Sequence, residues 1–207
     1  HYLARFDEGE FANVVVNGDI HQQNADRVGC TRREVKTITY AFIYGAGDVK
    51  LGHSLDPALS DAQKKTLGQD LRRKFLDAIP GLEPLIDAVK QKVRTCGRLR
   101  GLDGRPIFCK AEHSALNYLL QSCGAILSKR WVVIGQELID AAGLTYDTDY
   151  TRCAYIHDEV QLSVVPQEVD RVKQLLENAA PLAGKHYHFR VPITASADSG
   201  ASWQDTH

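Results

Sequence analysis

Two basic and two aromatic residues recur at every fourth position of one stretch of the sequence: Arg32, Lys36, Tyr40 and Tyr44. On an α-helix this spacing places them along one slanting stripe, because each step overshoots a full turn by about 40°. The cations fall in the first turns, where the helix dipole adds to their attraction for phosphate. Such a stripe suits a nucleoside triphosphate, with Tyr40 near the sugar or base. The alternative interpretation is an amphipathic helix with a solvated basic edge.

Two adjacent carboxylates separate a pair of β-prone runs later in the chain. Residues 153–156 and 160–165 flank His157-Asp158-Glu159 and predict a tight hairpin with the acids at its turn. Carboxylate oxygens are preferred ligands of Mg²⁺, and two such ions assist phosphoryl transfer. Successive strand residues face opposite sides, so Asp158 and Glu159 need not share a role. A turn bearing solvated acids is the alternative.

Polar residues elsewhere extend this chemistry. Asn117 and Gln121 are four residues apart in a helix-forming stretch. Amide donors at this spacing could reach the N3 and O2 acceptors that base pairs present in the minor groove, although a solvated helix face would have the same pattern. His21 comes shortly before the basic stripe, and Gly45 follows Tyr44 as a helix stop.

The elements that position these residues form helices with interspersed hairpins, which predicts an α+β fold. Thr31 and Glu34 make a capping box, so the stripe helix begins at about 31 and ends near Tyr44. Further helices are predicted over residues 60–78, 82–94, 112–142 as one helix or two, and 167–183. Strands are predicted around a turn at 101–105, around the acidic turn, and over residues 188–195.

The composition is that of a soluble globular protein with an uneven distribution of charge. The net charge is −1, but residues 26–130 carry +8 and the remainder −9, so the middle of the chain is the part that could contact phosphate. Five scattered cysteines without a C-x-x-C pair exclude a disulfide framework or zinc site and indicate a reducing cytoplasm. The sequence has neither a signal peptide nor an apolar run of about 18 residues, so no membrane association is expected.

Taken in order, these segments resemble family A (Pol I-type) DNA polymerases, and most closely the replicative branch of short-tailed bacteriophages. The matching motifs lie along the whole chain: residues 1–7, 17–21, 31–47, 101–105, 119–122 and 157–159, with Ser202-Trp203 near the end. The resemblance implies a right-hand polymerase fold, template-directed DNA synthesis and a location in the cytoplasm, of a bacterial host if phage-encoded. Its partners would be primer-template DNA and a deoxynucleoside triphosphate, and its cofactor two Mg²⁺ ions.

The resemblance also implies a role for each site residue. Arg32 and Lys36 would bind the triphosphate with His21, and Tyr40 would pack against its sugar and base. Lys36 would also protonate the leaving pyrophosphate, as a lysine beside phosphate can. Tyr44 and Gly45 would shape the template side of the new pair. The implied metal ligand is Asp158, with Glu159 as a second catalytic carboxylate near the primer end, and the implied minor-groove contacts are Asn117 and Gln121.

By the same resemblance, residues 13–111 are helical fingers, whereas residues 1–12 and 112–207 are part of an antiparallel-sheet palm. The chain begins at His1 and contains no methionine, so we expect it to be a piece of a longer polypeptide. The family's first catalytic Asp, its thumb and any exonuclease domain would lie upstream, and this piece would be inactive without them. The alternatives are a single-subunit RNA polymerase and a non-catalytic, polymerase-derived DNA-binding module.

Overall fold

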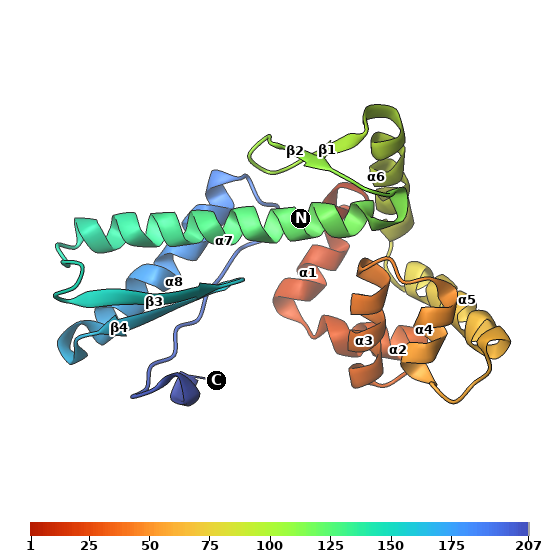
Figure 1. The fold of residues 1–207 in the computed structure, drawn as a ribbon, viewed down its shortest axis with the longest axis horizontal. Helices are drawn as coiled ribbons and strands as arrows, with labels where there is room; N and C mark the ends of the chain where they lie inside the picture. Colours follow the sequence, from red (N-terminus) through yellow and green to blue (C-terminus); the bar gives the residue numbers. More distant parts are fainter. Residues whose placement is uncertain (207) are drawn as a thin grey trace. The chain divides into compact units, whose positions relative to one another are not determined.

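The computed structural model describes residues 1–206 and has an α+β architecture, as predicted (Figure 1). The chain divides into two compact units. Unit 1 holds residues 1–101 and 105–120, and unit 2 holds residues 102–104 and the chain from 121 onward. Among the described helices, none is both long and apolar enough to cross a membrane.

Unit 1 is mainly helical and carries one short hairpin. Its helices and 3-10 turns are η1 (Leu3–Arg5), α1 (Glu10–Asn17), α2 (Ile20–Val28), α3 (Arg32–Ile43), α4 (Asp48–Leu55), α5 (Asp61–Ala78), α6 (Leu82–Cys96) and η2 (Glu112–Ser114). Its antiparallel strands are β1 (Arg98–Arg100) and β2 (Pro106–Phe108). The capping boxes Thr31/Glu34 and Ser60/Gln63 begin α3 and α5 where the sequence predicts them.

Helices α1, α2 and α4 were not predicted. Gly9 and Gly47 precede α1 and α4 without a capping side chain, and α1 contains three consecutive β-branched valines. Helix α2 did carry a signal, because Asp19 caps its first turn and Gly29 ends it in the left-handed region. These helices are short, so much of their stability must come from tertiary packing rather than local propensity.

Glycine lets α4 and α5 approach each other closely. A β-carbon at Gly52 of α4 would overlap the backbone of Lys64, and one at Gly68 of α5 would overlap the backbone of Asp48. Beside this crossing, Arg72 of α5 donates to Asp48 at 2.7 Å and to the carbonyl oxygen of Ala46 at 2.7 Å. The crossing therefore fixes the segment that follows α3.

Unit 2 packs two helices with a hairpin. The helix α7 (Ala115–Ala141) begins in unit 1 and continues into unit 2, which also contains β3 (Tyr150–Ile156), β4 (Glu159–Val164), η3 (Pro166–Glu168), α8 (Val169–His186) and η4 (Trp203–Thr206). Ile139 of α7, Tyr150 of β3 and Leu176 of α8 meet in one core. The indole of Trp131 donates to the carbonyl oxygen of Leu176 at 2.8 Å and ties α7 to α8.

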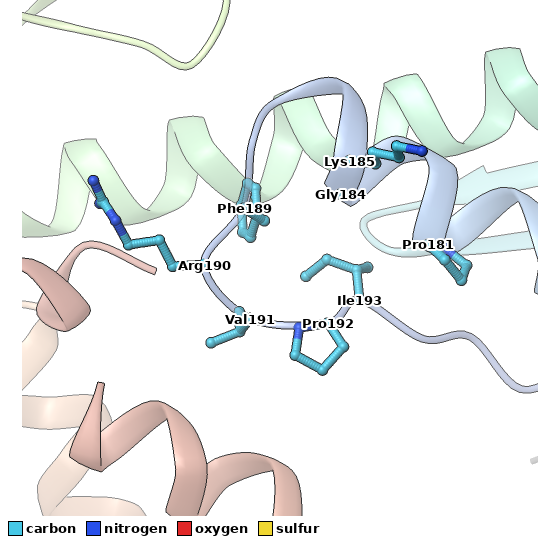
Figure 2. Close-up of a pocket in the computed structure, with 8 residues that line it drawn as sticks. All are labelled: Pro181, Gly184, Lys185, Phe189, Arg190, Val191, Pro192 and Ile193. Carbon is cyan, nitrogen blue, oxygen red and sulfur yellow. The ribbon is translucent and has the colours of Figure 1, made fainter. Parts of the chain in front are cut away.

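The predicted strand at 188–195 is wrong. His188 has a φ of 51°, and the amides of His188 and Phe189 donate to the carbonyl oxygens of Lys185 and Gly184, so both residues close α8 in a Schellman motif. Beyond them the chain runs irregularly past the end of α8, and Ile193 packs over Gly184 (Figure 2). An open cavity of about 330 Å³ lies there. Within residues 1–206 no strand pairs with this segment, and an extended segment needs such a partner to form a ladder.

Candidate functional site

The stripe predicted on α3 exists and faces solvent. Val35, Ile38 and Phe42 are buried on one side of the helix. On the other side Arg32, Lys36, Tyr40 and Tyr44 are exposed, and the two tyrosines keep 51% and 56% of their surface accessible. Two cations and two exposed aromatic rings on one face suit a ligand that has both negative charge and a flat ring.

Hydrogen bonds fix the start of α3, and a glycine fixes its end. At the start, the amide of Glu34 donates to the Thr31 hydroxyl at 3.2 Å, and the amide of Thr31 donates to the Glu34 carboxylate at 2.7 Å, which lowers the pKa of Glu34. At the end, Gly45 has a φ of 75°. A β-carbon there would lie 2.7 Å from the carbonyl oxygen of His113. Position 45 therefore requires glycine for both conformation and space.

Asp19 links the residues predicted to contact the triphosphate. Its carboxylate accepts from the amides of His21 and Gln22 at 3.0 and 3.1 Å, and so caps α2. The same carboxylate accepts from Nε of Arg32 at 2.9 Å. The hydrogen bond from Arg32 is the main reason why the pKa of Asp19 lies below its ordinary value. Asp19 thus joins the start of α2 to the start of α3, a role that the sequence interpretation missed although aspartate is a favoured N-cap residue.

The ring of His21 is partly enclosed. Its Nδ1 atom is buried and has no hydrogen-bond partner among the described residues. His21 and Arg32 nevertheless bond to the same carboxylate, one through its backbone and the other through its side chain. The structure therefore brings these two predicted residues together, in unit 1 with Lys36 and Tyr40.

The acidic residues lie at a two-residue turn between β3 and β4. Ile156 pairs with Glu159, so His157 and Asp158 form the loop. His157 has a φ of 55°, whereas Asp158 does not have a positive φ, a combination that matches a type II′ turn with a histidine in the position where glycine is usual. Asp158 is exposed, and Glu159 accepts a hydrogen bond from the Gln161 amide. Backbone strain of this kind concentrates at functional sites.

Ser128 of α7 holds this turn by a hydrogen bond. Its hydroxyl donates to the carbonyl oxygen of His157 at 3.1 Å and lies 2.6 Å from the Tyr155 hydroxyl. A serine hydroxyl has one hydrogen, and the carbonyl can only accept, so Tyr155 donates to Ser128. Ser128 is only 8% exposed. The sequence interpretation missed both Ser128 and Tyr155, because no local pattern marks a serine inside a long helix as the support of a distant turn.

Asn117 and Gln121 lie one turn apart on α7, as predicted. Gln121 is exposed, whereas the side-chain oxygen of Asn117 is buried and has no partner among the described residues. A buried carbonyl oxygen without a donor is energetically costly. Asn117 belongs to unit 1 and Gln121 to unit 2.

The carboxylates offer the chemistry of a magnesium site but not a full set of ligands. Asp158 presents hard oxygen donors at an exposed turn, which suits Mg²⁺. Within the described part of the chain, no group of three His, Cys, Asp or Glu side chains is arranged to hold a metal ion. Asp158 could therefore be one ligand of a magnesium ion, but the described residues do not form a complete set of ligands.

The sequence of the chain matches a known protein family. The model of DNA polymerase family A matches residues 4–205, almost the whole chain. The chain belongs to DNA polymerase family A. This membership confirms the resemblance drawn from the motifs and favours it over a single-subunit RNA polymerase.

Individual relatives agree with the family A assignment. The chain is 33% identical to the DNA-directed DNA polymerase of Enterobacteria phage T3 and 32% identical to that of Escherichia phage T7. Each alignment covers 100% of this chain but 31% of the relative, so the chain spans under a third of these polymerases. The DNA polymerase I of Aquifex aeolicus is 27% identical over 83% of the chain.

A solved structure shares the polymerase fold. The POL domain of Pol1 from M. smegmatis, solved in complex with DNA primer-template and dNTP, superimposes with a TM-score of 0.81. The match covers 100% of this chain and 38% of that one, at 24% sequence identity. It confirms the predicted fold, that of a family A polymerase domain.

Proposed function

We propose that this chain is the fingers and palm portion of an enzyme that performs template-directed DNA synthesis. In the reaction, the primer 3′-oxygen forms a bond to the α-phosphorus of a deoxynucleoside triphosphate, and the bond to pyrophosphate breaks. The single observation that carries the proposal is the exposed Arg32–Lys36–Tyr40 stripe on a helix capped at both ends. Such catalysis is chiefly positioning and charge stabilisation, which a rigid helix can supply.

The triphosphate is proposed to lie along the stripe. Arg32 and Lys36 bind its phosphates with His21, and Lys36 donates a proton to the leaving pyrophosphate. Tyr40 contacts the sugar and base, while Tyr44 and Gly45 shape the template side of the new base pair. The bond between Asp19 and Arg32 holds the guanidinium at the first turn of α3.

Unit 2 is proposed to supply the carboxylates. Asp158 binds magnesium at the turn, and Glu159 lies beside the primer end. Two bound Mg²⁺ ions would supply charge stabilisation for phosphoryl transfer. Ser128, through His157, holds the turn that carries Asp158.

Primer-template DNA is proposed as the partner of α7, where Asn117 and Gln121 donate to minor-groove acceptors. Residues 13–111 are assigned to the fingers, and residues 1–12 and 112–207 to the palm. An upstream polymerase segment, in the same or a separate chain, is proposed to carry the first catalytic Asp. The incomplete ligand set around Asp158 supports this requirement.

Primer extension with and without the upstream polypeptide tests the proposal. We expect residues 1–207 alone to give no extension with Mg²⁺ and four deoxynucleotides, and addition of the upstream polypeptide to restore it. Asp158→Asn should abolish the restored activity. Robust extension by the 207-residue chain alone would show that the catalytic carboxylates have been misassigned. Failure to extend in the complete assembly, with DNA binding retained, would favour the non-catalytic DNA-binding module.

A further inference from the structure

The β1–β2 hairpin has one buried and one exposed face. Leu99 pairs with Ile107, and both are buried in the core of unit 1. On the opposite face Arg98 pairs with Phe108, and Arg100 pairs with Pro106. Residues paired across an antiparallel ladder have β-carbons about 5 Å apart, so Phe108 and Arg98 start from neighbouring positions on this face.

Phe108 is exposed to an unusual degree. It keeps 70% of its surface accessible, more than any other large hydrophobic side chain of residues 1–206. Strand alternation directs the side chain at position 108 outward, but it does not require an aromatic residue there, because a polar residue would leave the core unchanged. An aromatic ring held out on a strand, rather than on a mobile loop, is a rigid apolar platform.

The chain segment that carries this ring is rich in basic residues. Residues 90–110 contain seven Lys or Arg and a single acidic residue, Asp103. The pKa of the Cys96 thiol is lowered mainly by the Thr95 hydroxyl, and Lys92 and Arg98 lower it further. Lys92, Arg98, Arg100 and Arg105 are all exposed. A ring flanked by cations is the composition that single-stranded nucleic-acid sites use, because a base stacks on the ring while phosphates meet the charges.

We infer that this outer face of the hairpin, formed by Arg98, Arg100 and Phe108, binds single-stranded DNA without sequence preference. The inference rests on the proposed function only in taking DNA as the polymer, and it adds a contact that neither the α3 stripe nor the acidic turn provides. Phe108 stacks on an unpaired base, and Arg98 binds a neighbouring phosphate. In a duplex the faces of the bases are already stacked on one another, so the platform favours unpaired strands.

An acidic peptide would also be attracted to these cations, but it would gain little from an exposed aromatic ring. The dependence of binding on Phe108 therefore separates the two ligands. A base gains stacking energy from the ring, whereas a glutamate side chain has no π-face with which to stack.

Fluorescence anisotropy of a labelled 20-nucleotide oligothymidylate, titrated with the 207-residue chain, tests the inference. We expect Phe108→Ala to weaken binding by about fivefold or more, and Phe108→Tyr, which keeps the ring, to stay within about twofold of the original chain. Arg98→Ala should lower the slope of log affinity against log salt concentration by about 0.7, the value for one phosphate contact on a single strand. Phe108→Ala should leave that slope unchanged.

Lys65→Ala is the matched control, because Lys65 is exposed on α5 and its loss removes the same charge. Its effect on affinity should be smaller than that of Arg98→Ala. A blunt duplex should bind the Phe108→Ala variant as it binds the original chain. The inference is overturned if Phe108→Ala leaves oligothymidylate binding unchanged, or if it weakens binding of duplex or of a polyglutamate peptide equally. The titration contains no nucleotide, so its outcome is independent of whether Lys36 and Asp158 have their proposed roles.

Discussion

Ser128, a buried residue of α7, is joined to the turn at His157 by its hydroxyl. Its donation to the His157 carbonyl oxygen and acceptance from Tyr155 satisfy a side chain that is otherwise enclosed. We predict that Ser128→Ala lowers the rate of nucleotide incorporation in the complete polymerase by about tenfold, because Asp158 loses its fixed position. Affinity for primer-template should not change.

The Ser128→Ala prediction is checked by single-turnover incorporation at increasing Mg²⁺ concentration. The variant should require more Mg²⁺ to reach half its maximal rate, which a general loss of stability would not cause. Tyr155→Phe should have a smaller effect of the same kind. Ser163→Ala, at an exposed position on β4, is the control and should behave like the original protein. An unchanged Mg²⁺ requirement in Ser128→Ala would refute the positioning role.

Asp19 gives a pH-dependent prediction at the same scale. Arg32 holds the pKa of Asp19 below its ordinary value, so the ionised carboxylate stabilises the folded chain at neutral pH. This contribution is complete above the unfolded-state pKa of about 3.9 and is lost as pH falls through the lower folded-state pKa. Asp19→Asn keeps a capping oxygen but loses the charge, so it should be less stable than the original chain at pH 7.

The stability difference caused by Asp19→Asn should shrink as the pH falls below about 4. Urea unfolding at a series of pH values measures the difference directly. Asp26→Asn is a useful comparison, because Asp26 is exposed on α2 and accepts a hydrogen bond from Gln22. A difference for Asp19→Asn that stays constant down to pH 2 would show that the pairing with Arg32 contributes nothing to folding.

At the scale of the element, the crossing of α4 and α5 depends on two glycines. Gly52→Ala or Gly68→Ala would force the helix backbones apart. The added β-carbon would meet backbone atoms of the other helix, which cannot move aside as a flexible side chain can. We expect a loss of about 2 kcal/mol or more in the free energy of unfolding. Gly124→Ala on α7 is the control with the opposite sign, since nothing lies within 4 Å of its added β-carbon. It should stabilise the chain by up to about 1 kcal/mol.

Urea unfolding measures the free energy of unfolding of the three glycine variants. A Gly52→Ala variant as stable as the original chain would mean that α4 and α5 can separate without cost. In that case the crossing of α4 and α5 would not fix the residues after Tyr44. The Gly124→Ala result shows whether helix propensity alone accounts for any difference.

Elements with strong local signals could be predicted from the sequence. The stripe helix, the helix after Ser60 and both hairpins follow from caps, stops and turn residues, and their bounds differ little from those observed. Helices α1 and α4 could not be predicted in this way, because Gly9 and Gly47 offer no capping side chain. The strand expected at 188–195 failed because His188 closes the preceding helix, an event that β-propensity does not report.

Some residues of the candidate site could also be predicted from the sequence, and others could not. Residues with a fixed spacing, such as Arg32 and Lys36, could be found from the sequence because a helix converts spacing into direction. Asp19 could have been found as an N-cap, but its bond to Arg32 joins two helices. Ser128 could not, since 29 positions separate it from the turn that it supports. Contacts between distant residues depend on the fold and leave no local pattern.

At the scale of the whole molecule, the segment after α8 gives a test of the proposed contact with an upstream polypeptide. Val191, Pro192 and Ile193 lie in an irregular segment outside the two described sheets, and with Pro181 they contribute apolar side chains to the cavity beside α8 (Figure 2). We predict that the upstream polypeptide supplies a strand here. Hydrogen exchange should then show the amides of Val191 and Ile193 slowed on addition of that polypeptide. Exchange that stays fast in an assembly active in primer extension would contradict this prediction.

The central claim is that the stripe on α3 binds the incoming triphosphate, and Lys36 tests it most directly. The measurement is single-nucleotide incorporation by the complete polymerase carrying Lys36→Ala, with Arg33→Ala as control, because Arg33 is exposed on the same turn but lies off the stripe. We predict that Lys36→Ala lowers the incorporation rate by about 100-fold or more while affinity for primer-template changes by less than about twofold. Arg33→Ala should change neither. An incorporation rate in Lys36→Ala equal to that of the original enzyme, or an equal loss of DNA affinity, would contradict the claim.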